Sequence, residues 1–114
     1  RQRFLTAPLM KWMFGKYVSD PAQRGNDLMS PVRASAERLR GLPATLIVVA
    51  ENDILRDEGE AMGRRLDEAG VEVTTVRFNG VVHDWGMLNG FAALHPTRTL
   101  IRLVGSVLRD YLEK

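Results

Sequence analysis

Residues 44–78 read ATLIVVAENDILRDEGEAMGRRLDEAGVEVTTVRF, and this stretch decides the fold. Its first seven residues, 44–50, form an apolar run rich in β-branched side chains, which is typical of a strand buried on both faces of a parallel sheet. A helix is predicted to follow as far as residue 69. Residues 71–78 predict a second strand, which is half buried because its pattern partly alternates. Two strands joined by a helix form a right-handed βαβ unit, so the sequence predicts the α/β class.

Local signals mark where the helices begin and end. Asp57 and Glu60 resemble a capping box at the start of the central helix, and Gly70 is placed to end that helix in the left-handed conformation. Apolar residues at helical spacing predict further helices over residues 4–17 and 96–113. The remaining predictions are an N-cap at Thr6, a helical turn at 34–39 and a loop or short helical turn over 79–95.

The predicted sheet is incomplete. A strand as apolar as residues 44–50 belongs in the interior of a sheet, with a neighbour on each edge, but the sequence supplies only one obvious partner strand. The second edge would expose unpaired backbone groups beside an apolar surface. We therefore expect the missing strands to come from an upstream part of the same protein, from a second chain or from a swapped copy of this chain.

Composition excludes several classes of protein. With 114 residues, 45% hydrophobic and 26% charged, the chain can form a packed core, and disorder is not expected. The net charge of +2 without a basic stripe argues against a nucleic-acid partner. The longest apolar run, 46–50, is too short to span a membrane. The absence of cysteine excludes disulfides, and the two histidines with scattered carboxylates match no metal-binding spacing.

Two chemically capable residues follow the two predicted strands. Asp53 comes after the first strand and His83 after the second. Because functional groups gather at the carboxyl ends of parallel strands, these side chains should lie close together. A carboxylate beside an imidazole holds the ring in one tautomer and stabilises the imidazolium, so that the ring can act as general base for a serine hydroxyl. Asp before His is also the order in which α/β-hydrolases carry these two groups.

The surrounding residues make the resemblance specific. The segments Ser30-Pro31, Gly41-Leu42-Pro43, Ala50-Glu51-Asn52-Asp53-Ile54-Leu55-Arg56-Asp57-Glu58-Gly59-Glu60 and Val82-His83-Asp84-Trp85-Gly86-Met87-Leu88-Asn89 resemble the C-terminal signature of hormone-sensitive-lipase-like (bacterial family IV) esterases. The resemblance covers nearly the whole chain, including the Trp12-Met13-Phe14 and Tyr17 segment.

The resemblance implies a partial α/β-hydrolase fold, with the last two parallel strands, their flanking helices and a sheet that lacks the upstream strands. Residues 1–30 would be the end of a cap-like helical segment and loop, and residues 31–114 the C-terminal part of the catalytic domain. Asp53 would be the triad acid and His83 the triad base of a carboxylic-ester hydrolase.

The chain also departs from the family pattern. Most members carry Gly after the histidine, where this chain has Asp84. No Gly-x-Ser-x-Gly elbow and no His-Gly-Gly motif occurs in this chain, and Ser106 lies within a predicted helix, where it cannot form a strand-to-helix elbow. The nucleophilic serine is therefore expected upstream, on a part of the enzyme that this chain lacks, and the chain alone is expected to be inactive.

The implied partners are a small carboxylic-ester substrate and either the remainder of the hydrolase or a second copy that completes the sheet. The resemblance implies no cofactor, and it implies that a homodimer can form. A cytoplasmic location is expected because the chain shows neither cysteines nor a signal peptide. The rival hypothesis is a non-catalytic α/β binding or assembly module that uses its open strand edge as an interaction surface. A nucleotide-binding domain is disfavoured because no glycine-rich turn is present.

Each candidate residue also has a structural interpretation. Asp53 could cap a helix, His83 could be a surface histidine, and Glu51 could hydrogen-bond loop backbone. Aromatic and methionine residues near Trp12 could line an acyl pocket or simply pack, so substrate-binding residues stay unassigned. His95, beside a proline at a helix start, is interpreted as structural.

Overall fold

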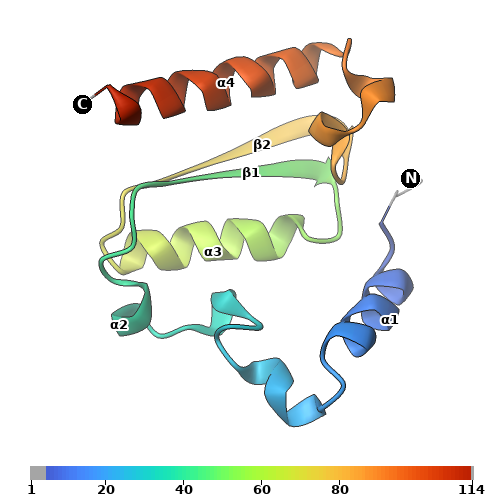
Figure 1. Ribbon diagram of the computed structural model, residues 1–114, viewed down its shortest axis with the longest axis vertical. Helices are drawn as coiled ribbons and strands as arrows, with labels where there is room; N and C mark the ends of the chain where they lie inside the picture. Colours follow the sequence, from blue (N-terminus) through green and yellow to red (C-terminus); the bar gives the residue numbers. More distant parts are fainter. Residues whose placement is uncertain (1–4, 114) are drawn as a thin grey trace. The chain divides into compact units, whose positions relative to one another are not determined.

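The computed structural model describes residues 5–113. Its helices and strands, in chain order, are α1 (Ala7–Tyr17), α2 (Ala36–Leu39), β1 (Thr45–Asn52), α3 (Arg56–Glu68), β2 (Val73–Val82) and α4 (His95–Leu112), joined by loops and short 3₁₀ turns (Figure 1). The chain divides into two compact units, with the boundary between His83 and Asp84.

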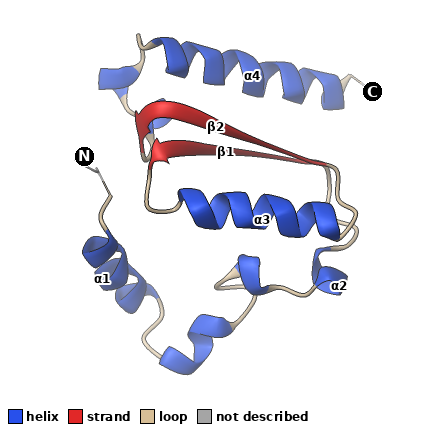
Figure 2. Cartoon of the chain, turned by 180° about the vertical axis from the view of Figure 1, so that it is seen from behind, coloured by secondary structure: helices blue, strands red, loops and turns tan. Residues whose placement is uncertain are grey.

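The first unit contains the predicted βαβ arrangement. β1 and β2 pair in parallel as a two-stranded sheet, and α3 connects them and lies along one face of the sheet (Figure 2). Two glycines of α3 allow this close approach. A Cβ on Gly59 would lie 2.8 Å from Val49 Cγ1, and one on Gly63 would meet the hydroxyl oxygen of Thr75. The α/β class predicted from the sequence is confirmed.

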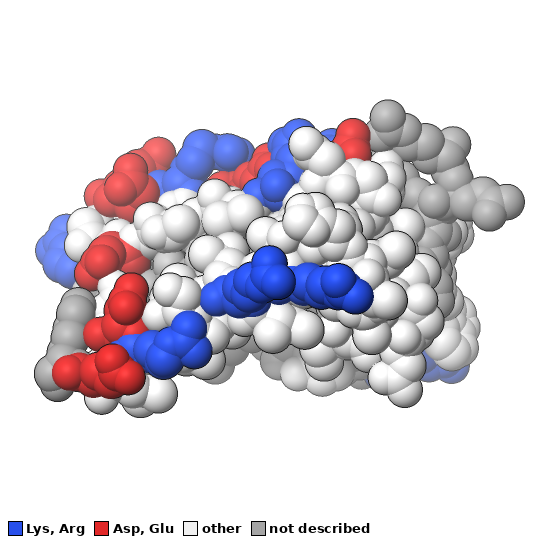
Figure 3. Space-filling view, turned by 90° about the horizontal axis from the view of Figure 1, so that it is seen from above, with Lys and Arg blue, Asp and Glu red and all other residues white. Residues whose placement is uncertain are grey.

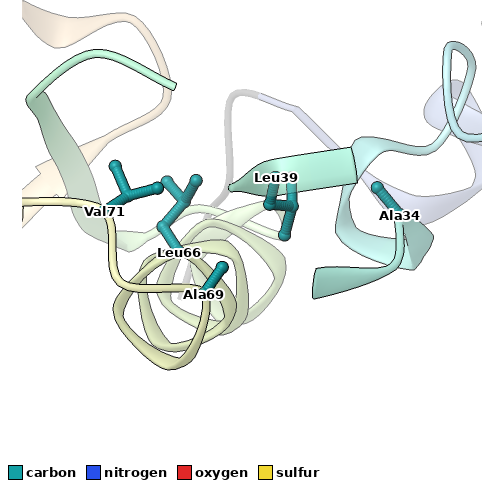
Figure 4. Packing of buried hydrophobic residues seen from close by; sticks show 5 residues of the cluster. All are labelled: Ala34, Leu39, Leu66, Ala69 and Val71. Carbon is teal, nitrogen blue, oxygen red and sulfur yellow. The ribbon is translucent and has the colours of Figure 1, made fainter. Parts of the chain in front are cut away.

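The core of this unit lies at the C-terminal end of α3. Leu66 and Ala69 at the end of the helix and Val71 just after it pack with Leu39 of α2 and with Ala34 (Figure 4). Gly70 has a φ of +80° and ends α3 as predicted. The Val71 N–H donates to the Leu66 carbonyl, as in a Schellman motif. The helix end is therefore closed by the same residues that form the core.

The burial of β1 differs from the expectation for an interior strand. Only Val49 and Ala50 are buried within it, and the other residues of the strand are partly exposed. Within residues 5–113, β1 pairs with β2 alone, so its second edge has no strand beside it. The apolar pattern of β1 therefore matches a larger sheet than the described residues form.

Several predicted boundaries were wrong. The capping box is absent, because α3 begins at Arg56 after an N-cap at Leu55 that makes no side-chain cap bond. Asp57 instead accepts a hydrogen bond from the Arg56 side chain. The second strand was predicted to end at residue 78 and continues to Val82, so the loop predicted from residue 79 starts later.

The outer helices agree with the sequence to within a few residues. Thr6 caps α1, as predicted, by accepting a hydrogen bond from the Leu9 N–H. The helix itself starts at Ala7, and residue 4 of the predicted segment lies outside the described residues. α2 covers 36–39 rather than 34–39, and α4 begins one residue earlier than predicted.

The surface carries both signs of charge. One face shows basic and acidic side chains interspersed and separated by uncharged surface (Figure 3). No helix within residues 5–113 combines the length and apolar character that crossing a membrane requires.

Candidate active site

The carboxyl ends of β1 and β2 bring Asp53 and His83 to the same edge of the sheet. Asn52, the last residue of β1, pairs with Val82, the last residue of β2. Asp53 and His83 each follow directly. Since the strands are parallel, the two side chains leave the sheet as neighbours.

The two side chains are in direct contact. His83 Nδ1 and Asp53 Oδ2 lie 2.7 Å apart, which is a short hydrogen-bond distance. The Asp53 side chain is 11% exposed and that of His83 is 24% exposed, so the contact is largely shielded from water. The proximity expected from the strand order is confirmed.

A second bond fixes the orientation of the Asp53 carboxylate. Its Oδ1 accepts from the Leu55 N–H at 2.8 Å, which leaves Oδ2 directed to His83. This is a local turn bond of the kind that Asp often makes to the backbone two residues on. The turn bond of Asp53 and its contact with the histidine therefore occur together, through different oxygens, and Asp53 does not cap α3, whose N-cap is Leu55.

This geometry selects one histidine tautomer. The carboxylate is an acceptor only, so Nδ1 must carry the proton and donate it to Asp53. In the neutral ring, Nε2 then has the lone pair and can take a proton from another group. The pair can therefore serve as a general base whose imidazolium form is stabilised by the carboxylate.

The strand pairing is irregular just before these two residues. Paired residue numbers differ by 28 as far as Ala50 and Phe78, and by 30 at Asn52 and Val82. Gly80 lies within the irregularity, with a φ of +75° that favours glycine. Its N–H donates to Glu51 Oε2 at 2.7 Å. Sequence reasoning gave Glu51 only a backbone hydrogen bond and took Gly80 as part of a loop, although the Asn-Gly pair signalled a backbone irregularity.

Arg56 stabilises the loop that contains Asp53 through two hydrogen bonds. Its Nη1 donates to the Glu51 carbonyl oxygen at 2.7 Å, and its Nε donates to Asp57 Oδ1 at 2.9 Å. Sequence reasoning missed this role, although Arg56 stands within the Asp-x-Leu-Arg-Asp-Glu pattern. The arginine therefore links the end of β1 to the start of α3 across the three-residue segment 53–55 that contains Asp53.

The residue after His83 has an unusual backbone. Asp84 has a φ of +58° and a ψ of 20°, which lies in the left-handed region. Glycine adopts this conformation without strain, and Asp tolerates it better than most residues. A glycine would suit this turn, and Asp84 is compatible with it.

A second ion pair of the first unit joins Arg77 of β2 to Glu60 of α3. Arg77 donates to both carboxylate oxygens of Glu60, at 2.6 and 2.8 Å. The hydrogen bond from Arg77 lowers the pKa of Glu60 from its ordinary value of 4.5. These two residues line an open groove between α3 and β2 that includes neither Asp53 nor His83.

The aromatic and methionine residues considered for an acyl pocket receive no further assignment. Trp12 of α1 is 63% exposed, and Lys16 lies over its ring. His95 is exposed at the start of α4. Among residues 5–113, no group of three or more His, Cys, Asp or Glu side chains is arranged to hold a metal ion.

Several known proteins with similar sequences are named as hydrolases or esterases. The family model described as alpha/beta hydrolase fold matches residues 1–87. An arylesterase of Saccharolobus solfataricus is 37% identical over 94 residues, which cover 82% of this chain and 28% of that protein. An ethyl acetate hydrolase of Pseudomonas putida is 37% identical over 81 residues, which cover 71% of this chain and 25% of that protein.

Solved structures agree with the sequence matches. A thermostable esterase from Pseudomonas putida superposes with a TM-score of 0.88 at 47% identity, covering 90% of this chain and 32% of the esterase. Brefeldin A esterase, a bacterial homologue of human hormone-sensitive lipase, gives a TM-score of 0.83 at 31% identity, covering 90% of this chain and 28% of that esterase.

The chain spans 27 to 29% of the length of three curated relatives that it matches. Its two parallel strands with flanking helices form a part of the fold of these larger enzymes. The chain belongs to the α/β-hydrolase fold family, among the hormone-sensitive-lipase-like esterases.

Proposed function

We propose that this chain is the C-terminal part of a serine carboxylic-ester hydrolase and supplies the acid and the base of its catalytic triad. Asp53 is the acid, His83 is the base, and the nucleophilic serine lies on an upstream part of the enzyme. The observation that carries this proposal is the 2.7 Å contact between Asp53 Oδ2 and His83 Nδ1, made while the other Asp53 oxygen is bound to backbone.

The proposed reaction uses each nitrogen of His83 differently. Nε2 takes the proton of the serine hydroxyl as the serine oxygen attacks the ester carbonyl carbon. The imidazolium returns that proton to the leaving alcohol as the carbon–oxygen bond breaks, which leaves an acyl-enzyme. Water then attacks the acyl-enzyme with the same base, releasing the acid and the free serine. Asp53 holds Nδ1–H throughout and stabilises the positive ring, and the chemistry needs no cofactor.

The incomplete sheet supports the assignment to a larger enzyme. The second edge of β1 has no strand among the described residues, although its apolar sequence suits a sheet interior. We propose that upstream strands pair with this edge. We further propose that residues 1–30 end the substrate-covering cap and that residues 31–114 complete the catalytic domain.

The substrate class proposed is a small ester with a short or medium acyl chain. An ethyl acetate hydrolase and an arylesterase are among the relatives, which supports small esters as the substrate class. No side chain of the described residues is assigned to acyl or alcohol recognition.

The proposal is tested on the protein encoded by the complete open reading frame. We expect it to hydrolyse p-nitrophenyl acetate, and His83→Ala to lower kcat by about 10⁵- to 10⁶-fold. His95→Ala is the matched control, because His95 is exposed at the start of α4, and this variant should keep wild-type activity. The 114-residue chain alone should be inactive. Enzyme-like hydrolysis by the chain alone that disappears in His83→Ala would contradict the proposal.

A further inference from the structure

Glu51 makes a bond across the strand pair that has no counterpart in a regular sheet. Its Oε2 accepts from the Gly80 N–H at 2.7 Å, although the two residues are 29 positions apart in sequence. A carboxylate that accepts from a backbone N–H makes a charge-assisted bond, which is stronger than a neutral one. The bond joins the end of β1 to the part of β2 that leads into His83.

The irregular pairing explains why this bond is needed. From Ala50 to Asn52, β1 advances two residues while β2 advances four, from Phe78 to Val82. The extra residues of β2 form a bulge, where backbone groups lose their opposing partners. Within the bulge, Gly80 adopts its positive φ, and the Glu51 side chain accepts its N–H in place of a backbone carbonyl.

The bulge determines which residue faces Asp53. If the pairing of Thr45–Ala50 continued unchanged, Val81 would lie opposite Asp53. His83 would then be two residues further along, a displacement of about 6.6 Å at the usual rise of a strand. The two-residue shift instead places His83 opposite Asp53, where their side chains meet.

The main chain of Glu51 is also held in place, by a hydrogen bond from Arg56. The Arg56 guanidinium donates to the Glu51 carbonyl oxygen at 2.7 Å. Arg56 begins α3, so the main chain of Glu51 is tied to the helix while its carboxylate is tied to Gly80. The residue therefore links the loop that carries Asp53 to the strand segment that carries His83.

We propose that Glu51 is a positioning residue for the Asp53–His83 pair. It stabilises the bulge in β2 through the Gly80 N–H and so maintains the register that brings the imidazole to the carboxylate. This inference rests on the proposed function, since positioning affects a rate only if the pair is catalytic. Glu51 is not proposed to touch the substrate.

The test compares three variants of the complete enzyme. Glu51→Ala removes the acceptor, and Glu51→Gln keeps an amide oxygen that can accept from Gly80. Glu72→Ala is the control, because it removes an exposed carboxylate just before the start of β2, at the end of the strand far from His83. We expect Glu51→Ala to lower kcat about 10- to 100-fold with little change in KM, because misplacement of a catalytic group acts on the chemical step. Glu51→Gln should recover most of this loss, and Glu72→Ala should match wild type.

Two magnetic-resonance measurements distinguish positioning from general stability. The Gly80 amide should be protected from hydrogen exchange in wild type and in Glu51→Gln. The downfield proton of His83 Nδ1 should be present in both and weakened in Glu51→Ala. Rapid exchange of the Gly80 amide in the wild-type enzyme would overturn the proposal even if Glu51→Ala fails to fold.

The remaining outcomes separate this inference from the function on which it rests. An active wild type, an inactive His83→Ala and a Glu51→Ala with the kcat of Glu72→Ala would refute the positioning role alone. A Glu51→Gln as impaired as Glu51→Ala would refute the hydrogen bond to Gly80 as the cause. A wild-type enzyme without esterase activity would refute the proposed function instead.

Discussion

Replacement of Asp53 by Asn tests the geometry most directly, because the structure dictates how the new amide must point. Asp53 Oδ1 accepts from the Leu55 N–H at 2.8 Å, and only the oxygen of an asparagine can take this place. The amide NH₂ group of Asp53→Asn then occupies the position of Oδ2, 2.7 Å from His83 Nδ1. An NH₂ group donates, so Nδ1 must become the acceptor and the ring proton must move to Nε2.

The expected loss follows from this change of tautomer. With its proton on Nε2, His83 cannot take the proton of the serine, and the positive ring also loses its carboxylate partner. Removal of the carboxylate from such a triad lowers kcat by about 10⁴-fold, which corresponds to about 5.5 kcal/mol at 1.36 kcal/mol per tenfold. The free energy of unfolding should change by only about 1 kcal/mol, because both hydrogen bonds keep a partner.

The assay measures kcat for p-nitrophenyl acetate in the complete enzyme, together with thermal unfolding and the ¹⁵N chemical shifts of His83. Asp110→Asn makes the same chemical change at an exposed position of α4 and serves as control. If Asp53→Asn kept activity within about tenfold of the control, the assignment of Asp53 as the triad acid would be wrong.

Three further outcomes are expected. In a denaturant titration of the complete enzyme, Gly63→Ala should lower the free energy of unfolding by about 1 to 3 kcal/mol, because its Cβ would meet the Thr75 hydroxyl. The control Gly90→Ala has open space around its Cβ and should leave the free energy of unfolding nearly unchanged. The pKa of Glu60 is lowered by Arg77, so the stability from this pair is present above pH 4.5 and is lost as pH falls below that value. In thermal unfolding, Glu60→Gln should therefore lose less stability than wild type between pH 7 and pH 3. Equal losses in the two proteins would contradict this. The isolated 114-residue chain should self-associate in sedimentation velocity because of its open strand edge, whereas a stable monomer with cooperative unfolding would favour the binding-module hypothesis.

The sequence predicted the parts of the fold that depend on local patterns. The apolar run before Glu51 and the partly alternating run after Gly70 indicate two strands, because burial selects these patterns directly. Gly70 ends α3 as predicted, since only a residue without a Cβ readily adopts its φ of +80°. The positions of Asp53 and His83 after successive parallel strands were sufficient to predict that they meet.

The parts that sequence reasoning missed depend on pairing between distant residues. Asn79-Gly80 is a turn signal in isolation, and only the pairing of the flanking residues Phe78 and Val82 with β1 makes it part of a bulge within a continuing strand. The carboxylate of Glu60 suggested a capping box, but Arg77 of the neighbouring strand takes both of its oxygens. In each case, a partner about 17 to 29 residues away outweighs the local preference.

The length of the bulge in β2 also has a consequence for sequence change in this region. Side chains along a strand alternate between the two faces, so an offset of two residues moves the imidazole by one full repeat and returns it to the same face. Deletion of one residue between Phe78 and Val82 would rotate every later side chain of the strand to the opposite face. Loss of two residues would keep the imidazole on its face but would remove the shift in pairing and leave the imidazole about 6.6 Å further along the strand from its carboxylate.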